Sequence, residues 1–316
     1  MTISAVVTTW NCQKTVLRCV HSLREAGIDQ IYVADCGSTD GTPELFGREL
    51  VCTAAPSFGA ARNAGLRAAA EQFVLFIDGD WVCDSTCLRS LMDCVAADPS
   101  RAIAIPRYID DAGNYHTGHN VRRFPTAKAL CIEFLMLHKL LSASPETCDY
   151  RMLDFDHSTD RDIDHPCSPF FLSRREALLA AGSYDESISS AWIEDIDLAH
   201  RLESAGLRRR FSSKSLAVHM GRETLRHHYI EAHYDEYYGS VLAYCRKYLP
   251  ESFDLLRRSL IVGMALKTGF SYAVPKVLRA KLLRHYGLYN DDAEIQSYRH
   301  MYVRTLRKAI EACEGA

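Results

Sequence analysis

The sequence predicts an α/β fold: a mainly parallel, doubly wound sheet with helices on both faces, followed by a C-terminal helical region. The 316-residue chain is 47% hydrophobic and 24% charged, which is typical of a folded protein with a large core. Strand and helix patterns alternate with short connections over residues 3–109, which favours parallel strands. From residue 224 onward only helical patterns occur.

The elements of the first half are predicted from apolar periodicity and from the turn residues between them. The expected strands span residues 3–9, 28–36, 50–55, 73–80 and 101–109. The expected helices span residues 13–27, 59–70 and 84–98, with a short helix that starts at Pro43 after Thr42 as N-cap. In parallel sheets ligands bind beyond the carboxyl ends of the strands, so the residues that end these strands are functional candidates.

The second half is less regular. A strand followed by a helix is expected over residues 169–186, a helix over 191–206, where Gly206 ends it, and a strand over 215–221. In the C-terminal region one stripe of residues at helical spacing indicates an amphipathic helix. The stripe consists of Ile230, Tyr234, Tyr238, Val241 and Cys245.

Charge and cysteine content argue against several classes of protein. The 37 Lys and Arg against 40 Asp and Glu give a net charge of −3, so we expect no nucleic-acid partner. The twelve cysteines include no Cys-x-x-Cys pair, which disfavours zinc knuckles and thioredoxin-like chemistry. No secretion signal and no apolar run of about 20 residues is visible, so we expect a cytoplasmic protein with reduced, mostly buried thiols.

The strand over 73–80 ends in Asp78-Gly79-Asp80, two carboxylates at the end of a buried run. Like charges this close repel each other, and a bound cation would remove the repulsion. Carboxylate oxygens suit Mg²⁺ or Mn²⁺, and the glycine would let a phosphate or sugar approach the backbone. A simple Asp-Gly-Asp turn is the alternative interpretation.

Six motifs in a fixed order resemble those of the family 2 glycosyltransferases, which have the GT-A fold. They are "VVTTWN", "VADCGSTDGT", "GAARNAG", "FVLFIDGDW", "GSYDESISSAWIEDIDLAHRLESAGL" and "LAVHMG", and they cover about residues 3–221. The resemblance implies a transferase that uses a nucleotide-diphosphate sugar, with a UDP-sugar as the family default, and a divalent cation (Mn²⁺ or Mg²⁺). It also implies a nucleotide-sugar-binding half over 1–110, an acceptor-binding and catalytic half over 111–222, and a C-terminal helical region over 223–316.

Three residues match family positions that contact the donor. Thr8 and Asp35 match positions that hold the nucleotide base and ribose, and Arg62 in "GAARNAG" would lie near the donor. The family often has two acids at the turn after the second strand; the second position is Cys36 in this chain, which leaves Asp35 as the candidate acid. A turn cap is an alternative role for Asp35, and an ion pair across a helix face is one for Arg62.

Three further residues match the metal site of the family. Asp78 would contact the ribose directly or through the metal, Asp80 would ligate the metal, and His219 in "LAVHMG" would be a further ligand. A structural role is the alternative for His219, since a lone histidine at a strand end commonly has one.

The helix over 191–206 carries the candidate catalytic base. Asp195 shares one face with leucines three and seven residues later, so it should point inward, whereas Asp197 precedes Arg201 by four residues, which predicts a solvated ion pair. The resemblance assigns the base to Asp195, with Glu194 as the second candidate. Both acids would also complement the dipole of the helix N-terminus.

These roles imply an inverting transfer, with Asp195 taking the proton of the acceptor in a single displacement at the anomeric carbon. A nucleotidyltransferase with a similar sheet is one alternative, but the loop "TTWNCQKT" lacks the glycine-rich pattern of that class. A non-catalytic sugar-nucleotide-binding protein is another, and it would be expected to lack Asp195 or Asp80.

The C-terminal stretch 255–289 holds seven basic residues and no acid among leucines and aromatics. Such a helix either contacts an anionic membrane or packs on the protein with one face exposed to solvent. Membrane contact would fit a lipid-linked acceptor; a saccharide is the alternative acceptor. The basic residues are Arg257, Arg258, Lys267, Lys276, Arg279, Lys281 and Arg284.

Overall fold

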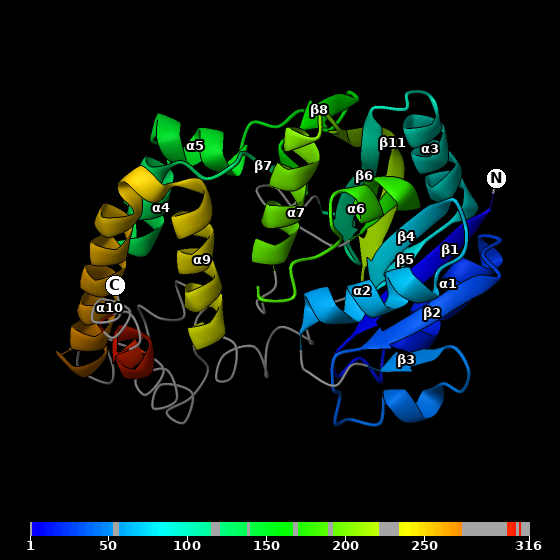
Figure 1. Cartoon of the computed structure of the whole chain (residues 1–316), viewed down its shortest axis with the longest axis horizontal. Helices are drawn as coiled ribbons and strands as arrows, with labels where there is room; N and C mark the ends of the chain where they lie inside the picture. The colour runs from blue at the N-terminus through cyan, green and yellow to red at the C-terminus, as the bar shows by residue number, and fades with distance from the viewer. Residues whose placement is uncertain are drawn as a thin grey trace. The chain divides into compact units, whose positions relative to one another are not determined.

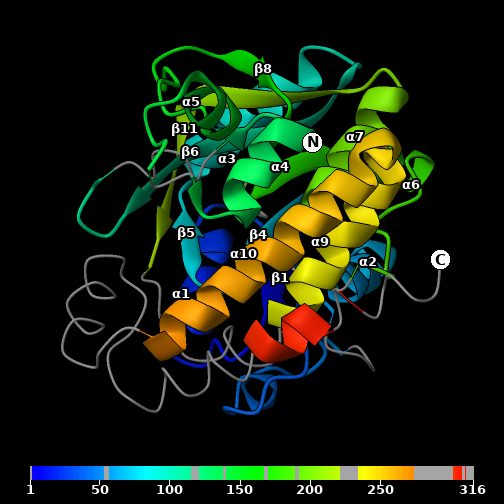
Figure 2. The ribbon, with the colours of Figure 1, turned by 90° about the vertical axis from the view of Figure 1, so that its left-hand side faces the viewer.

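The computed structural model describes residues 2–52, 57–114, 121–137, 140–166, 170–188, 192–220, 234–273, 302–307 and 310 (Figures 1 and 2). The chain divides into two compact units. Unit 1 comprises Met1–Phe124 and Asp149–Leu225, and unit 2 comprises Pro125–Cys148 and Arg226–Ala316. Unit 2 therefore combines most of the C-terminal region with a segment from the middle of the chain.

Unit 1 contains a nine-stranded sheet in the order β3-β2-β1-β4-β10-β6-β11-β5, with β8 paired to β11. Strands β3, β2, β1 and β4 are parallel to one another, and so are β6 and β11; β10 lies antiparallel between β4 and β6. The strands are β1 (Ile3–Thr9), β2 (Gln30–Asp35), β3 (Leu50–Cys52), β4 (Phe73–Asp78), β5 (Trp81–Cys83), β6 (Arg101–Asp110), β8 (Arg161–Ile163), β10 (Phe171–Arg174) and β11 (Arg208–His219). A separate pair is formed by β7 (Val121–Arg122) and β9 (His165–Pro166).

Helices cover both faces of this sheet, which confirms the predicted fold class (Figure 1). Ala5 and Val7 of β1 pack with α1 and α3, whereas Val6 faces the opposite side with α2, α6 and α7, because successive side chains of a strand alternate. The helices of unit 1 are α1 (Val16–Glu25), the 3-10 helix η1 (Pro43–Leu45), α2 (Phe58–Ala68), α3 (Ser85–Ala96), α6 (Arg175–Ala180) and α7 (Ile193–Ser204).

Two predicted element ends differ in the structure. The strand predicted over 73–80 corresponds to β4, which already ends at Asp78; after a turn, β5 pairs antiparallel with β11. Thr42 precedes η1 without capping it. Its hydroxyl instead accepts a hydrogen bond from the backbone N–H of Cys12 and donates one to Asp40, so it joins two loops.

Helix α7 is buried on nearly all sides, and this corrects one prediction. Asp195 is buried as expected, but Asp197 is fully buried as well. The ion pair between Asp197 and Arg201 is present, with Oδ2 2.8 Å from Nε, yet it is not the solvated pair that helix phase predicted. Helix phase was misleading because α7 packs against β9 and β11, so its polar face is covered too.

In unit 2, α10 packs against α4 and α9 (Figure 2). Val241 and Cys245 of the predicted stripe are buried and Tyr238 is partly buried, while Ile230 and the side chain of Tyr234 lie outside the described residues. The remaining helices of the chain are α4 (Ala127–Phe134), α5 (Pro145–Arg151), α9 (Tyr234–Tyr248), the 3-10 helix η3 (Pro250–Ser252) and α10 (Phe253–Ala273).

The basic C-terminal stretch is less unbalanced than its composition suggested. Arg257 lies 3.2 Å from a carboxylate oxygen of Asp254, an acid just before the stretch, so the prediction of an unbalanced charge is wrong for Arg257. Lys267 donates a hydrogen bond of 3.2 Å to the hydroxyl of Tyr238. Four of the basic residues lie outside the described residues, namely Lys276, Arg279, Lys281 and Arg284.

Two expectations from composition can be compared with the structure. Nine of the cysteines have described side chains; all nine are free thiols and seven of them are buried, as predicted. Over the described ranges, no helix has the length and apolar character that crossing a bilayer requires.

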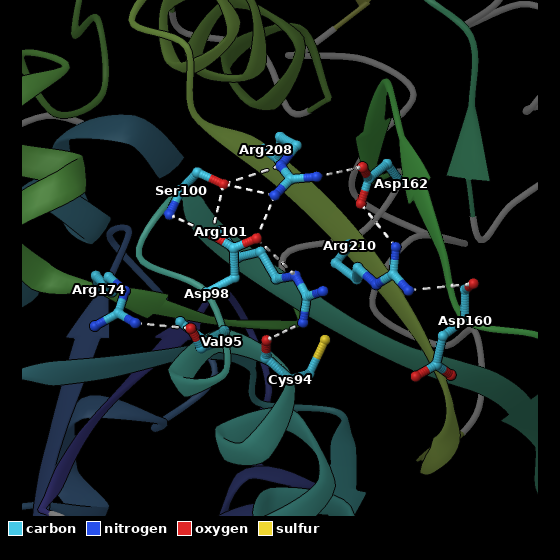
Figure 3. A network of polar contacts seen from close by, with 10 residues as sticks. All are labelled: Cys94, Val95, Asp98, Ser100, Arg101, Asp160, Asp162, Arg174, Arg208 and Arg210. Atoms are coloured by element: carbon cyan, nitrogen blue, oxygen red, sulfur yellow. Dashed lines mark hydrogen bonds and ion pairs between the residues drawn. The ribbon is translucent and has the colours of Figure 1, made fainter.

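Figure 3 shows a polar network at the amino ends of β6 and β11, which we call the amino-end network. Its members are Asp98, Ser100, Arg101, Asp160, Asp162, Arg174, Arg208 and Arg210. Asp162 lies between two arginines, 3.4 Å from Arg208 and 3.0 Å from Arg210. Arg101 and Arg174 donate to backbone carbonyls in the last turn of α3, at 3.0 and 2.8 Å, where helix carbonyls lack partners within the helix. The network therefore ties α3 to β6 and β10.

Candidate active site

The predicted site residues lie at the end of the sheet opposite the amino-end network. Thr8 is paired with Asp78, and Thr9 with Asp35, because β1, β2 and β4 are parallel and end in step. We call this end the carboxyl edge, defined by the last residues of β1, β2 and β4. The turn after β4 carries Asp80, whose backbone carbonyl accepts a hydrogen bond of 2.7 Å from the N–H after β11.

Asp80 and His219 are neighbours, as the metal prediction requires. Nε2 of His219 lies 3.0 Å from Oδ2 of Asp80, and the ring of Trp81 stacks on the imidazole with centroids 4.4 Å apart. Asp78 lies two residues from Asp80, and its Oδ1 is buried without a hydrogen-bond partner among the described residues. The same ranges contain no preformed group of three His, Cys, Asp or Glu side chains that could hold a metal ion.

These donors fit a cation whose remaining ligands come from the substrate. Mg²⁺ is commonly bound by one or two carboxylates together with waters and phosphate oxygens. Asp80 and His219 can supply two adjacent ligands, and Oδ1 of Asp78, which has no hydrogen-bond partner among the described residues, lies close by in the sequence.

Gly79 has a packing role that the sequence did not indicate. A Cβ at Gly79 would lie 3.0 Å from Cγ2 of Thr9 and 3.3 Å from Cβ of Cys12. The missing side chain would face the protein, so packing requires a glycine here, and the approach of a phosphate or sugar to this backbone stays a prediction.

Arg62 lies at the centre of three acids, which we call the acid cluster: Glu194 and Asp195, which are buried, and Asp78, whose side chain is 28% exposed. Its Nη1 lies 2.8 Å from Oε1 of Glu194 and 3.4 Å from Oδ1 of Asp195, and its Nη2 lies 3.7 Å from Oδ1 of Asp78. Arg62 thus pairs with acids of α7 and β4, not with an acid across the face of its own helix. Sequence reasoning named all four residues but not this arrangement.

Tyr184 is a member of the site that sequence reasoning missed. Its hydroxyl donates a hydrogen bond of 3.1 Å to Oδ1 of Asp195. Asn63, next to Arg62 on α2, holds the Tyr184 backbone in both directions: Nδ2 donates to the Tyr184 carbonyl and Oδ1 accepts from its N–H, each at 2.9 Å. Both residues stand inside quoted motifs, "GSYDE" and "GAARNAG", but 121 residues separate them, so their contact could not be read from spacing.

Helix α2 can hold these groups because it lies very close to β1. A Cβ at Gly65 would be 2.3 Å from Cγ1 of Val6, so only glycine permits this approach. The helix begins after Ser57, whose hydroxyl accepts a hydrogen bond from the N–H of Ala60.

The acid cluster has three acids for one arginine, and burial changes their ionisation. Burial raises the pKa of Glu194 well above its usual range, and the nearby Asp195 carboxylate adds to the effect. Burial also raises the pKa of Asp195, against the opposing effects of Arg62 and the Tyr184 hydroxyl. Burial raises the pKa of Asp78 to about 7, although Arg62 opposes the change. The cluster therefore favours an additional positive charge, either a proton or a cation.

Asp35 and Thr8 occupy the nucleotide side of the predicted site in different ways. Oδ1 of Asp35 accepts hydrogen bonds from the N–H groups of Gly37 and Ser38, and its Oδ2 accepts one from Thr9. The structure thus shows the turn-capping role, while the contact with a base stays a prediction. The hydroxyl of Thr8 is buried, and within the described part of the chain no group bonds to it.

Known proteins resemble this chain in sequence. The pre-mycofactocin glycosyltransferase of Mycobacterium tuberculosis is 31% identical over 167 residues, which are 53% of this chain and 31% of that protein. The chondroitin synthase of Escherichia coli is 25% identical over 251 residues, which are 69% of this chain and 34% of that protein. The chain thus spans about a third of the length of these curated relatives.

Solved structures resemble it in fold. S. aureus TarS 1–349 in complex with UDP-GlcNAc aligns with a TM-score of 0.53 and 17% identity, over 100% of this chain and 92% of that one. GalNAc-T7 with UDP, GalNAc and Mn²⁺ aligns with a TM-score of 0.51 and 15% identity, over 70% of this chain and 44% of that one. The family model Glycosyl transferase family 2 matches residues 4–179, more than half of the sequence. The chain therefore belongs to glycosyl transferase family 2.

Proposed function

We propose that the protein is a metal-dependent, inverting glycosyltransferase that moves a sugar from a nucleotide-diphosphate sugar to an acceptor, with Asp195 as catalytic base. One observation supports this proposal more strongly than any other observation does. Oδ2 of Asp195 is buried and has no hydrogen-bond partner among the described residues, while Oδ1 of the same carboxylate is held by Arg62 and Tyr184. A buried carboxylate oxygen without a partner is unfavourable unless a substrate supplies the hydrogen.

Asp195 suits the role of base better than Glu194. The Tyr184 hydroxyl and Arg62 both contact Oδ1 of Asp195, which fixes the orientation of this carboxylate. Oε1 of Glu194 lies 2.8 Å from Nη1 of Arg62, and its Oε2 is likewise without a partner among the described residues. In the described ranges, Glu194 lacks the second donor, the Tyr184 hydroxyl, that fixes Asp195. We assign Glu194 the role of holding Arg62.

A divalent cation, Mn²⁺ or Mg²⁺, would be held by Asp80 and His219 with Asp78 beside them. When bound, the cation supplies charge that compensates the diphosphate leaving group. Asp80 and His219 are already adjacent, and the acid cluster next to them has excess negative charge. These features support the metal dependence that we propose.

The donor that we propose is a UDP-sugar. TarS, which shares the fold, has a solved structure in complex with UDP-GlcNAc, and GalNAc-T7 has one with UDP, GalNAc and Mn²⁺. Thr8 and Asp35 would contact the nucleoside, because they end neighbouring strands at the carboxyl edge. Arg62 would act on the donor through the acids that it holds.

For the acceptor we propose a saccharide or a lipid-linked molecule, met by a cytoplasmic enzyme that contacts the membrane surface. The support for membrane contact comes from α10. Leu255, Val262 and Leu266 are exposed along one face of this helix, together with Arg258. A face of this composition suits a surface of anionic lipid.

A screen of nucleotide-diphosphate sugars tests the proposal. We expect one donor to raise the melting temperature in the presence of Mn²⁺ and to lose this effect with a chelator, since binding at a hundredfold excess over Kd stabilises by about 2.7 kcal/mol. Transfer from that donor should give a product of inverted anomeric configuration, read by NMR. Retained configuration, or full activity with chelator present, would contradict the proposal; donor binding with no transfer to any acceptor would support the non-catalytic alternative.

A further inference from the structure

We propose that Tyr184 is a positioning residue whose hydroxyl, together with Arg62, holds Oδ1 of Asp195 and thereby leaves Oδ2 as the oxygen that takes the acceptor proton. The inference rests on the proposed function, since it specifies how the base of that reaction is oriented. Tyr184 touches the base and not the substrate, so its effect would pass entirely through Asp195.

The two oxygens of Asp195 have different surroundings. Oδ1 accepts a hydrogen bond of 3.1 Å from the Tyr184 hydroxyl and lies 3.4 Å from Nη1 of Arg62. Oδ2 is buried, and no group in the described ranges bonds to it. Because the carboxylate is planar, fixing Oδ1 with two donors from different elements also fixes the direction of the Oδ2 lone pairs.

The hydroxyl of Tyr184 is itself held in place and kept protonated. Asn63 binds both backbone groups of Tyr184, the guanidinium of Arg62 lies 5.4 Å from its ring centroid, and the ring meets Phe76 edge to face with centroids 6.0 Å apart. Burial raises the pKa of Tyr184, and the neighbouring Asp195 charge raises it further. The hydroxyl therefore donates to Asp195 at all pH values at which the enzyme would work.

The transfer step balances with this assignment. The acceptor O–H bond breaks and its proton moves to Oδ2 of Asp195, while the oxygen lone pair forms the new bond to the anomeric carbon. The bond from that carbon to the diphosphate oxygen breaks, and the nucleoside diphosphate leaves with the electron pair. Oδ1 keeps both of its contacts throughout.

Removing the hydroxyl has consequences that a purely structural residue would not produce. The groups that face Asp195 are Tyr184, Arg62 on α2, Glu194 on its own helix, and Asp78 on β4. Of these, Tyr184 and Arg62 lower the pKa of Asp195 against the larger effect of burial. Loss of the Tyr184 hydroxyl should therefore move the acidic limb of the kcat profile to higher pH.

The test compares Tyr184→Phe with a matched control. We expect Tyr184→Phe to lower kcat about tenfold, since a hydrogen bond to a charged group is worth roughly that factor, with the KM for the donor unchanged. The control is Tyr108→Phe, which also removes a buried tyrosine hydroxyl. That hydroxyl donates a hydrogen bond of 2.8 Å to the carbonyl of Phe170. Tyr108→Phe should reduce stability and leave the acidic limb where it is in the wild type.

Two further measurements distinguish a failure of this inference from a failure of the proposed function. In an Asp195→Asn background the Tyr184→Phe change should alter the residual rate by about twofold or less, because its target is gone. The carboxyl carbon of Asp195, followed by NMR without any substrate, should titrate at higher pH in Tyr184→Phe. An unchanged titration, or an undiminished effect in the Asp195→Asn background, would overturn the inference. A changed titration in a protein that transfers no sugar would leave the placement of Asp195 intact and overturn the proposed function instead.

Discussion

The two ends of the sheet in unit 1 are both rich in charge, but they balance it differently. The amino-end network contains four arginines and three aspartates, and part of it is exposed to solvent; the Arg208 side chain is 45% exposed. At the carboxyl edge three acids surround Arg62, whose side chain is 2% exposed. The amino-end network is thus nearly neutral and partly exposed to solvent, whereas the acid cluster has net negative charge and is mostly buried.

This difference separates a stabilising arrangement from a functional one. Exposed ion pairs contribute about 0 to 1 kcal/mol each, so the network adds to stability in small steps and needs no ligand. Buried charges without full compensation destabilise a fold, and they persist where a substrate, a proton or a cation completes them. The acid cluster therefore supports the proposal that the reaction takes place at this end of the sheet.

The largest expected effect comes from the base. Asp195→Asn should reduce turnover by a factor of about 10² to 10⁴, because the amide cannot accept the acceptor proton. Donor affinity, measured by calorimetry, should change little. A variant that keeps more than a tenth of wild-type turnover would show that Asp195 is not the base and would move the assignment to Glu194.

Asp197→Asn distinguishes the two buried aspartates of α7. Asp197 is fully buried against Arg201, so losing its charge should lower the free energy of unfolding by about 1–3 kcal/mol. Turnover per folded molecule should stay within a few-fold of the wild type. If Asp197→Asn reduces turnover more than Asp195→Asn does, the assignment of the base is wrong.

Replacing an aspartate by asparagine should have opposite effects on stability at the two ends of the sheet. The folded-state pKa of Asp78 is raised from 3.8 to about 7 by burial, so its ionisation in the folded protein is unfavourable, and stability should fall as pH rises through this window. Asp78→Asn should therefore be more stable than the wild type at pH 8 in metal-free buffer, with the advantage shrinking toward pH 4. Chemical unfolding at both pH values measures this.

Asp98→Asn in the amino-end network is the matched control for that change. Hydrogen bonds from Ser100 lower the pKa of Asp98, so its charge stabilises the fold above its pKa. Asp98→Asn should accordingly lose stability at pH 8. The same sign for both variants would remove the distinction between the two ends.

The smallest effect is expected for Arg208→Gln. This arginine contacts Asp98, Ser100 and Asp162, but it is largely exposed. Its loss should lower the free energy of unfolding by about 1 kcal/mol or less, with a smaller difference at high salt, and leave turnover unchanged. A large loss of turnover in this variant would mean that the amino-end network takes part in function.

The sequence was sufficient for those features that depend on local pattern. Alternating strands and helices, and the aspartates that end them, follow from periodicity and turn residues, so Asp35 and Asp78 could be placed at one edge. The acid cluster depends on the contacts of Arg62 with Glu194 and Asp195, which lie 132 and 133 positions away and which no local pattern encodes. The insertion of β10 between β4 and β6, and the burial of Asp197, were missed for the same reason.

The central claim is that the carboxyl edge binds a nucleotide diphosphate with a divalent cation held at Asp80 and His219. Calorimetric titration of UDP, with Mn²⁺ and with chelator, tests it most directly on the wild type, Asp80→Asn and Arg208→Gln. We predict that Mn²⁺ strengthens binding to the wild type and to Arg208→Gln, and that Asp80→Asn loses this Mn²⁺-dependent part while remaining folded. Equal Mn²⁺-dependent binding by Asp80→Asn and the wild type would contradict the account.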